Sequence, residues 1–287
     1  MTLTEAPRYA SSWLGLREPA DAAARAHDLL EPLRARLARP GAPADLLIRD
    51  LGTGTGSMQR WLAPLLPGPQ RWILQDHDAE LLAFAAGTAA SVAADGSAVT
   101  VMTRHADLTE LSAGDLLSTS LVTASALLDL LSRGQLDRLA AACLSAGCPA
   151  LLTLSVTGGV DFSPADPLDA EFAAGFADHL RHHVAGRELL GPDAVDHAVR
   201  AFTERGAVVQ VSSSPWLLGP DRAALLDEWL RGWVAAAAER RPDLDASSYL
   251  NRRLDALATG DLRVTVHHTD LLALPHGATT TSNGATS

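Results

Sequence analysis

Short apolar runs alternate with segments of helical spacing along the first half of the chain. The first run, 46–48, suits a buried strand, and residues 58–65 after it have the spacing of one helix face. Further runs of the same kind lie at 71–78, 99–103, 120–125 and 149–156. Strands that alternate with helices predict a mostly parallel sheet with helices on both faces.

The turn after the first run is rich in glycine. Asp50 ends the strand, and Gly52, Gly54 and Gly56 follow at every second position. Strand, glycine turn and helix are how an open α/β sheet builds a nucleotide crevice. The dinucleotide fingerprint has a different glycine spacing, and the chain has no lysine for a phosphate-binding P-loop. A glycine turn that binds NAD, or no ligand at all, stays open at this point.

Two acids follow the second run. Asp76 comes 20 residues after Gly56, a spacing that suits a carboxylate bound to a ribose diol. A carboxylate can accept hydrogen bonds from both ribose hydroxyls. Asp78 precedes a segment of helical spacing, so we expect it to be a helix N-cap.

The stretch Asp50-Leu-Gly-Thr-Gly-Thr-Gly-Ser57 resembles the first motif of class I S-adenosylmethionine-dependent methyltransferases. The resemblance implies S-adenosyl-L-methionine as cofactor, with its methionine part in the glycine loop and its amino group at Asp50. It implies that Asp76 binds the ribose, and that Asp107 and the next backbone N–H bind the adenine. The cofactor-binding residues expected in this way are Asp50, Gly52, Thr53, Gly54, Gly56, Asp76, His77, Asp107, Leu108 and Ser125.

The resemblance extends over about residues 45–275 and implies an α/β fold. The expected sheet is Rossmann-like, doubly wound and mostly parallel, with seven strands of which the last is antiparallel. We expect one domain over residues 1–275, with helices at 11–38 before the first strand. We further expect a helical cap insertion at about 158–190, a second helical insertion at about 216–258, and a disordered tail at 276–287.

Two residues are candidates for catalysis. Asp129 comes four residues after Ser125, where this family often has a residue facing the reacting methyl group; an acid in the first turn of a helix is the structural alternative. His179 lies in the expected cap, and histidine titrates near neutral pH. His182 and His183 follow it, but no carboxylate has a matching spacing, so we expect no metal site. The cap and the Trp216 region are expected to select the acceptor.

Composition excludes some partners. The net charge of −11 argues against a nucleic acid held by its phosphates. The start of the chain lacks a basic segment followed by an apolar run, and no apolar run reaches the ~20 residues of a membrane span. The sequence therefore predicts a cytoplasmic protein with no membrane partner, and it does not fix the oligomeric state.

These observations favour a methyltransferase acting on a small organic acceptor, with O-, N- or C-methylation undecided. A general base is needed only if the acceptor atom carries a proton at the working pH. Two alternatives stay open: an NAD(P)-dependent oxidoreductase, which has a related sheet, and a non-catalytic S-adenosylmethionine-binding protein. The glycine spacing and the absence of a Tyr-x-x-x-Lys pair count against the oxidoreductase.

Overall fold

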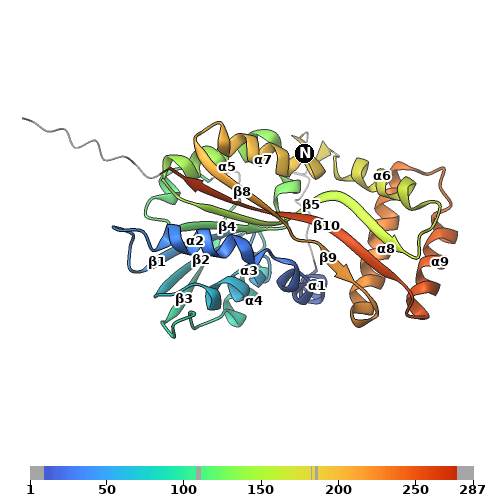
Figure 1. Cartoon of the computed structure of the whole chain (residues 1–287), viewed down its shortest axis with the longest axis horizontal. Coiled ribbons are helices and arrows are strands. Elements are labelled where there is room, and N and C mark those ends of the chain that lie inside the picture. Colours follow the sequence, from blue (N-terminus) through green and yellow to red (C-terminus); the bar gives the residue numbers. More distant parts are fainter. Residues whose placement is uncertain (1–9, 108–110, 182, 185–186, 277–287) are drawn as a thin grey trace, which may run out of the picture.

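The computed structural model describes residues 10–107, 111–181, 183–184 and 187–276. Its centre is a twisted sheet with the strand order β3-β2-β1-β4-β5-β10-β8, and β9 pairs with β10 beside this path (Figure 1). The strands are β1 (Leu46–Leu51), β2 (Gln70–Asp76), β3 (Val99–His105), β4 (Leu121–Ser125), β5 (Ala150–Ser163), β8 (Ala207–Ser213), β9 (Trp216–Leu218) and β10 (Arg263–Pro275). A separate two-stranded sheet contains β6 (His183–Val184) and β7 (Arg187–Glu188).

The sheet is Rossmann-like, as predicted. Strands β3, β2, β1, β4 and β5 are parallel to one another, and β10 is antiparallel to β5, β8 and β9. The main path of the sheet has the seven strands expected, and the short β9 adds an eighth strand at the edge of β10. Because β9 has only three residues, its pattern is too short to predict a strand from the sequence.

Helices cover both faces of the sheet. They are α1 (Ser11–Ala24), α2 (Leu30–Leu37), α3 (Ser57–Leu62), α4 (Ala79–Thr88), α5 (Arg133–Ser145), α6 (Asp169–Leu180), α7 (Ala194–Thr203), α8 (Ala223–Arg240) and α9 (Ala246–Ala258). One core joins α5 and α7 to the sheet, and a second joins α2, α3 and α4 to the other face around the buried Trp72. The helices predicted at 11–38 are present as α1, the short 3-10 turn η1 (His27–Leu29) and α2.

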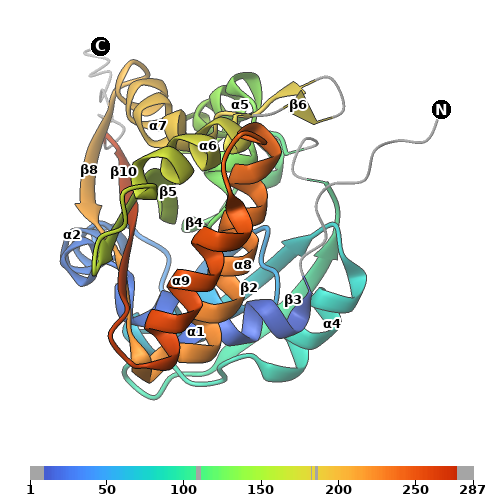
Figure 2. The ribbon, with the colours of Figure 1, turned by 90° about the vertical axis from the view of Figure 1, so that its right-hand side faces the viewer.

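A third core lies beyond the end of the parallel strands. The far half of β5, past its last pairing with β4 at Thr153, pairs with β10 alone, and β9 lies along the other edge of β10. Helices α6, α8 and α9 pack on this three-stranded extension (Figures 1 and 2). We call β9, α6, α8, α9 and the far halves of β5 and β10 the helical lobe.

The lobe corrects the boundaries of both expected insertions. The expected cap does not begin at Gly158, because β5 continues to Ser163, paired with Arg263 of β10. Glycines at 158 and 159 obscure this part of the strand in the sequence, since glycine is depleted in strands. The second insertion does not begin with a helix at Trp216, because this residue opens β9. The helices α6, α8 and α9 lie where helical segments were predicted.

Asp270 holds the bend where β5 and β10 leave the main sheet. Leu154 of β5 has a φ of 56°, and the pairing of β10 with β5 is irregular between Thr269 and Leu271. The buried Asp270 carboxylate accepts hydrogen bonds from the backbone N–H groups of Leu154 and Ala26, at 2.7 and 2.8 Å. It also accepts from the hydroxyl of Ser214 at 2.5 Å. One side chain thus satisfies a backbone donor at the irregular part of β5 and another in the segment between α1 and η1.

Within the described part of the chain, no helix combines the length and the apolar character needed to cross a bilayer. Of the expected tail 276–287, only His276 is described.

Candidate functional site

A cavity of about 630 Å³ lies between the carboxyl ends of the parallel strands, helix α1 and the helical lobe. This is the edge of an open α/β sheet where ligands bind. Ten of the residues predicted from the sequence line it: Asp50, Gly52, Thr53, Gly54, Asp76, His77, Asp107, Ser125, Asp129 and His179. Gly56 is not among the lining residues, and Leu108 lies outside the described residues.

The glycine loop has the geometry that its sequence suggested. Gly52, Gly54 and Gly56 have φ values of 61°, 54° and 86°, in the left-handed region that favours glycine. A Cβ on Gly52 would lie 3.0 Å from Leu127, and a Cβ on Gly54 would lie 3.3 Å from Leu14 of α1. Gly56 packs against α4 instead of facing the cavity, since its Cβ would lie 3.1 Å from Ala85. The loop is therefore a shape that only glycine forms without strain.

Asp50 is buried at the end of β1, with 1% of its surface exposed. Its carboxylate accepts hydrogen bonds from the hydroxyls of Thr53 and Thr123, at 2.5 and 2.7 Å. Burial raises the pKa of Asp50 to about 6, although both hydroxyls favour the charged form.

Asp76 links the glycine loop to β2. Its Oδ2 accepts the backbone N–H of Gly54 at 2.8 Å, and its Oδ1 accepts that of Asp78 at 3.0 Å. A carboxylate offers about four acceptor sites, so these bonds are compatible with a ribose ligand. Asp78 caps α4 by accepting from the N–H groups of Glu80 and Leu81, which confirms the predicted N-cap.

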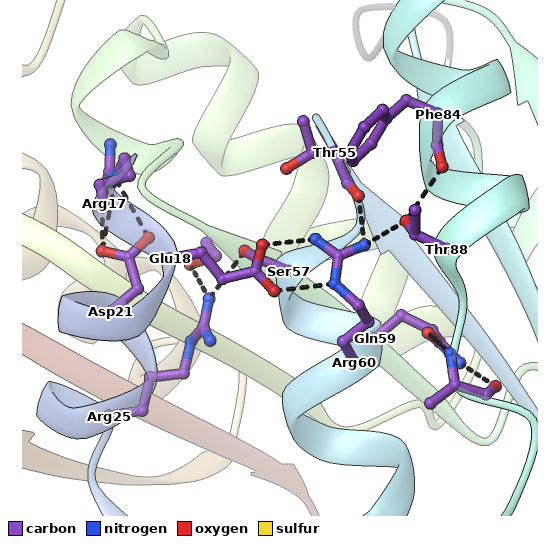
Figure 3. Close-up of polar contacts among 12 residues, drawn as sticks. Arg17, Glu18, Asp21, Arg25, Thr55, Ser57, Gln59, Arg60, Phe84 and Thr88 are labelled. Carbon is purple, nitrogen blue, oxygen red and sulfur yellow. Dashed lines mark hydrogen bonds and ion pairs between the residues drawn. The ribbon is translucent and has the colours of Figure 1, made fainter. Parts of the chain in front are cut away.

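Helix α1 forms one wall of the cavity and is bound to the glycine loop. Figure 3 shows Arg60 of α3 between Glu18 of α1 and the loop. Arg60 makes two bonds to the Glu18 carboxylate, at 2.7 and 2.5 Å, and donates to the Thr55 carbonyl. The fully buried Arg25 donates to the hydroxyls of Ser57 and Ser125. These contacts close the site on the side of the first helix.

A second set of contacts joins α1 to the helical lobe, and the sequence did not reveal it. Asp21 accepts from Arg17 at 3.0 Å and from the indole N–H of Trp216 at 3.0 Å. The Arg17 guanidinium lies 5.0 Å from the centre of the Trp216 ring. Arg17 also lines the cavity, and its charge is paired with Asp21 within α1.

Asp129 lies on a 3-10 turn, η5 (Leu128–Leu130), before α5. Asp129 is thus an acid in the first turn of a short helical segment, as the structural alternative expected, and it also lines the cavity; α5 itself begins at Arg133, with Ser132 as its cap. Asp129 is 8% exposed, and its Oδ1 has no hydrogen-bond partner among the described residues. Burial raises the pKa of Asp129 to about 6.

Two histidines from different parts of the lobe also line the cavity. The Nδ1 of His179, on α6, lies 3.1 Å from a carboxylate oxygen of Glu239 on α8, so this pair spans two helices of the lobe. His268, on β10, is buried, and burial lowers its pKa to about 3, so the ring is neutral. The sequence analysis missed His268, although its alternation with Val264 and Val266 places all three on the buried face of β10.

The charges around the cavity are strongly unequal. Seven of the residues that line it are acidic and one, Arg17, is basic. The acidic residues are Asp21, Asp50, Asp76, Asp78, Asp107, Asp129 and Glu228. The described residues contain no group of three or more His, Cys, Asp or Glu side chains arranged to hold a metal ion.

Comparisons with known proteins give only remote likenesses. No family model matches the chain, and no curated protein matches it. A phosphoethanolamine N-methyltransferase of Haemonchus contortus has a TM-score of 0.44 and 13% identity, covering 93% of this chain and 58% of its own. A cyclopropane synthase of Mycobacterium tuberculosis has a TM-score of 0.47 and 13% identity, covering 92% and 94%. This chain thus spans little more than half of the Haemonchus contortus enzyme. Similarity with TM-scores below 0.5 and 13% identity does not assign an activity.

Proposed function

We propose that this chain is an S-adenosylmethionine-dependent methyltransferase that acts on a small organic acceptor bound in the cavity. The observation that carries the proposal is the combination of a glycine cradle with an acidic cavity. The loop at 52–56 lets the ligand approach the backbone closely, and the carboxylates of Asp50 and Asp76 lie beside it.

The negative charge of the cavity favours S-adenosylmethionine over the dinucleotide that the oxidoreductase alternative requires. A dinucleotide would bring its doubly charged pyrophosphate to the glycine loop, next to two carboxylates. The arginine that lines the cavity is paired with Asp21 and is not available to offset this repulsion. S-adenosylmethionine has no phosphate; it carries positive charge on its sulfur and amino nitrogen and one negative carboxylate. Its net charge is therefore positive and complementary to the acidic site.

Each predicted cofactor residue has a role in this proposal. The glycine loop with Thr53 would enclose the methionine part, Asp50 would meet the amino group, and Asp76 would accept from the ribose hydroxyls. His77 and Asp107, which follow β2 and β3, would flank the adenine. Ser125, at the end of β4 and bonded to Arg25, would border the sulfur.

The bound cofactor would supply a methyl group on positively charged sulfur, which an acceptor can take without a covalent enzyme intermediate. The protein's task is to align the acceptor and to exclude water. Helix α1 and the helical lobe enclose the site for this purpose. Asp129 and His179 both line the cavity and are the candidates for accepting a proton from an acceptor that carries one.

Calorimetric titration tests the cofactor. We expect S-adenosylhomocysteine to bind and to raise the melting temperature, as a ligand of the folded state must, and NAD to do much less. Stronger binding of NAD would refute the proposal. Turnover with methyl-labelled S-adenosylmethionine on a metabolite extract then separates an enzyme from a binding protein, because a binding protein transfers no label.

A further inference from the structure

Among the described residues that line the cavity, acidic side chains outnumber arginine by seven to one. Asp129 and Glu228 are two of these acids, and Arg17 is engaged by Asp21 at 3.0 Å. His268 stays neutral because burial lowers its pKa. An anionic acceptor would meet uncompensated negative charge here, and a cationic one would meet charge of the opposite sign.

Asp129 provides a second, independent indication. More than nine tenths of this side chain is buried, it lines the cavity, and its Oδ1 has no hydrogen-bond partner in the described structure. Arg17 is the basic group that acts on it, but no ion pair joins the two residues. A buried carboxylate oxygen without a hydrogen-bond partner costs free energy on folding, and a perturbed acid in a cleft is a typical binding or catalytic group. A bound cation would supply the missing partner.

The remaining walls are apolar and aromatic. Phe176 of α6 and Trp229 and Trp233 of α8 line the cavity. The two indole rings are stacked with their centres 5.4 Å apart, and further aromatic rings of the lobe hold Trp233 in place. Such a surface fits a flat or bulky apolar body, and aromatic rings also tolerate a neighbouring cation.

We propose that the acceptor is a small amine with an apolar body, whose ammonium group binds Asp129 while its body packs against Phe176, Trp229 and Trp233. The proposal rests on the methyltransferase function and specifies its substrate class. An acceptor nitrogen needs a free electron pair, so one proton passes from the ammonium group to Oδ1 of Asp129. The N–H bond breaks, an O–H bond forms, and the electron pair stays on nitrogen.

Matched probes test the amine class. Tryptamine, tryptophol and indole-3-propionate share a ring and chain and differ in the charge of the end group; phenethylamine, phenethyl alcohol and hydrocinnamate repeat the series with a smaller ring. Binding is measured by calorimetry with S-adenosylhomocysteine present and absent. Of tryptamine and phenethylamine, we expect the one that binds more tightly to bind at least tenfold more tightly than the alcohol and the acid of the same series. We expect Asp129→Asn to remove this preference, and the control Asp255→Asn, an exposed acid of α9 outside the cavity, to keep it.

Three results would overturn the proposal. The first is binding of the acids as tight as that of the amines. The second is no binding of any amine to protein that binds S-adenosylhomocysteine. The third is an Asp129→Asn variant that loses affinity for S-adenosylmethionine but not for S-adenosylhomocysteine, because the carboxylate would then face the charged sulfur. Failure of S-adenosylhomocysteine to bind would refute the methyltransferase function instead, and amine binding to the protein alone would still be measurable.

Discussion

Asp129→Asn should change how the stability of the protein depends on pH. Burial raises the pKa of Asp129 from 3.8 to about 6 in the folded protein. An acid with a raised pKa favours folding while it is protonated, and this contribution is lost as the pH rises through the folded value. One pKa unit is worth about 1.4 kcal/mol, so the charged Asp129 lowers the free energy of unfolding by about 3 kcal/mol at neutral pH.

Asparagine keeps the shape of the side chain but cannot ionise. Its buried amide has unpaired polar atoms and costs roughly 1–3 kcal/mol at every pH. The stability of the variant relative to the parent should therefore improve by about 3 kcal/mol between about pH 4 and pH 7. At neutral pH we expect the variant to be at least as stable as the parent.

Asp50→Asn is the matched comparison, because burial also raises the pKa of Asp50 to about 6. Two threonine hydroxyls donate to Asp50, so its replacement loses hydrogen bonds to a charged group, each worth about 1.5–3 kcal/mol. We expect this variant to be less stable than the parent at neutral pH.

Urea unfolding followed by circular dichroism, at a series of pH values, measures both variants. The reasoning fails if Asp129→Asn loses as much stability at neutral pH as Asp50→Asn does. It also fails if the difference between Asp129→Asn and the parent does not vary with pH.

Three further predictions concern the loop, the lobe and the bend of the sheet. Asp76→Ala should weaken S-adenosylhomocysteine binding by a few kcal/mol in calorimetry, whereas Asp78→Ala should keep the affinity and lose about 1 kcal/mol of stability with the cap; the reverse pattern would exchange their roles. Gly232 lies in the middle of α8 on the cavity wall, and a Cβ there would touch nothing within 4 Å, so Gly232→Ala should stabilise the helix by up to about 1 kcal/mol. Gly232→Trp should block acceptor binding, whereas Ala235→Trp should not, because Gly232 lines the cavity and the equally exposed Ala235 does not; equal effects would argue against acceptor binding beside Gly232. Asp270→Ala should cost roughly 3 kcal/mol or more in thermal or urea unfolding, because it leaves buried backbone donors unpaired, and a loss below about 1 kcal/mol would contradict its role at the bend.

Local sequence was sufficient to predict the part of the site that one short segment builds. The loop at 52–56 follows a strand and consists of alternating glycines, so its left-handed conformation is fixed by residue type. Asp76 and Asp78 end a strand and begin a helix, and the structure assigns them the loop contact and the cap. Periodicity also predicted the sheet, since alternation of strand and helix permits few other arrangements.

The identity of the distant side chains that share the cavity depends on the three-dimensional fold. Trp216 and Asp21 are 195 residues apart and are joined by one hydrogen bond, and no local pattern encodes such a contact. The extension of β5 to Ser163 depends on β10, because glycine-rich backbone becomes a strand when a partner strand supplies the hydrogen bonds. Asp129 could be named from its place after β4, but its burial on the cavity wall and the unpartnered Oδ1 follow from the folded structure. The burial of a side chain and the charge around it depend on residues from many segments of the chain. The acceptor class was therefore proposed from the structure and not from the sequence.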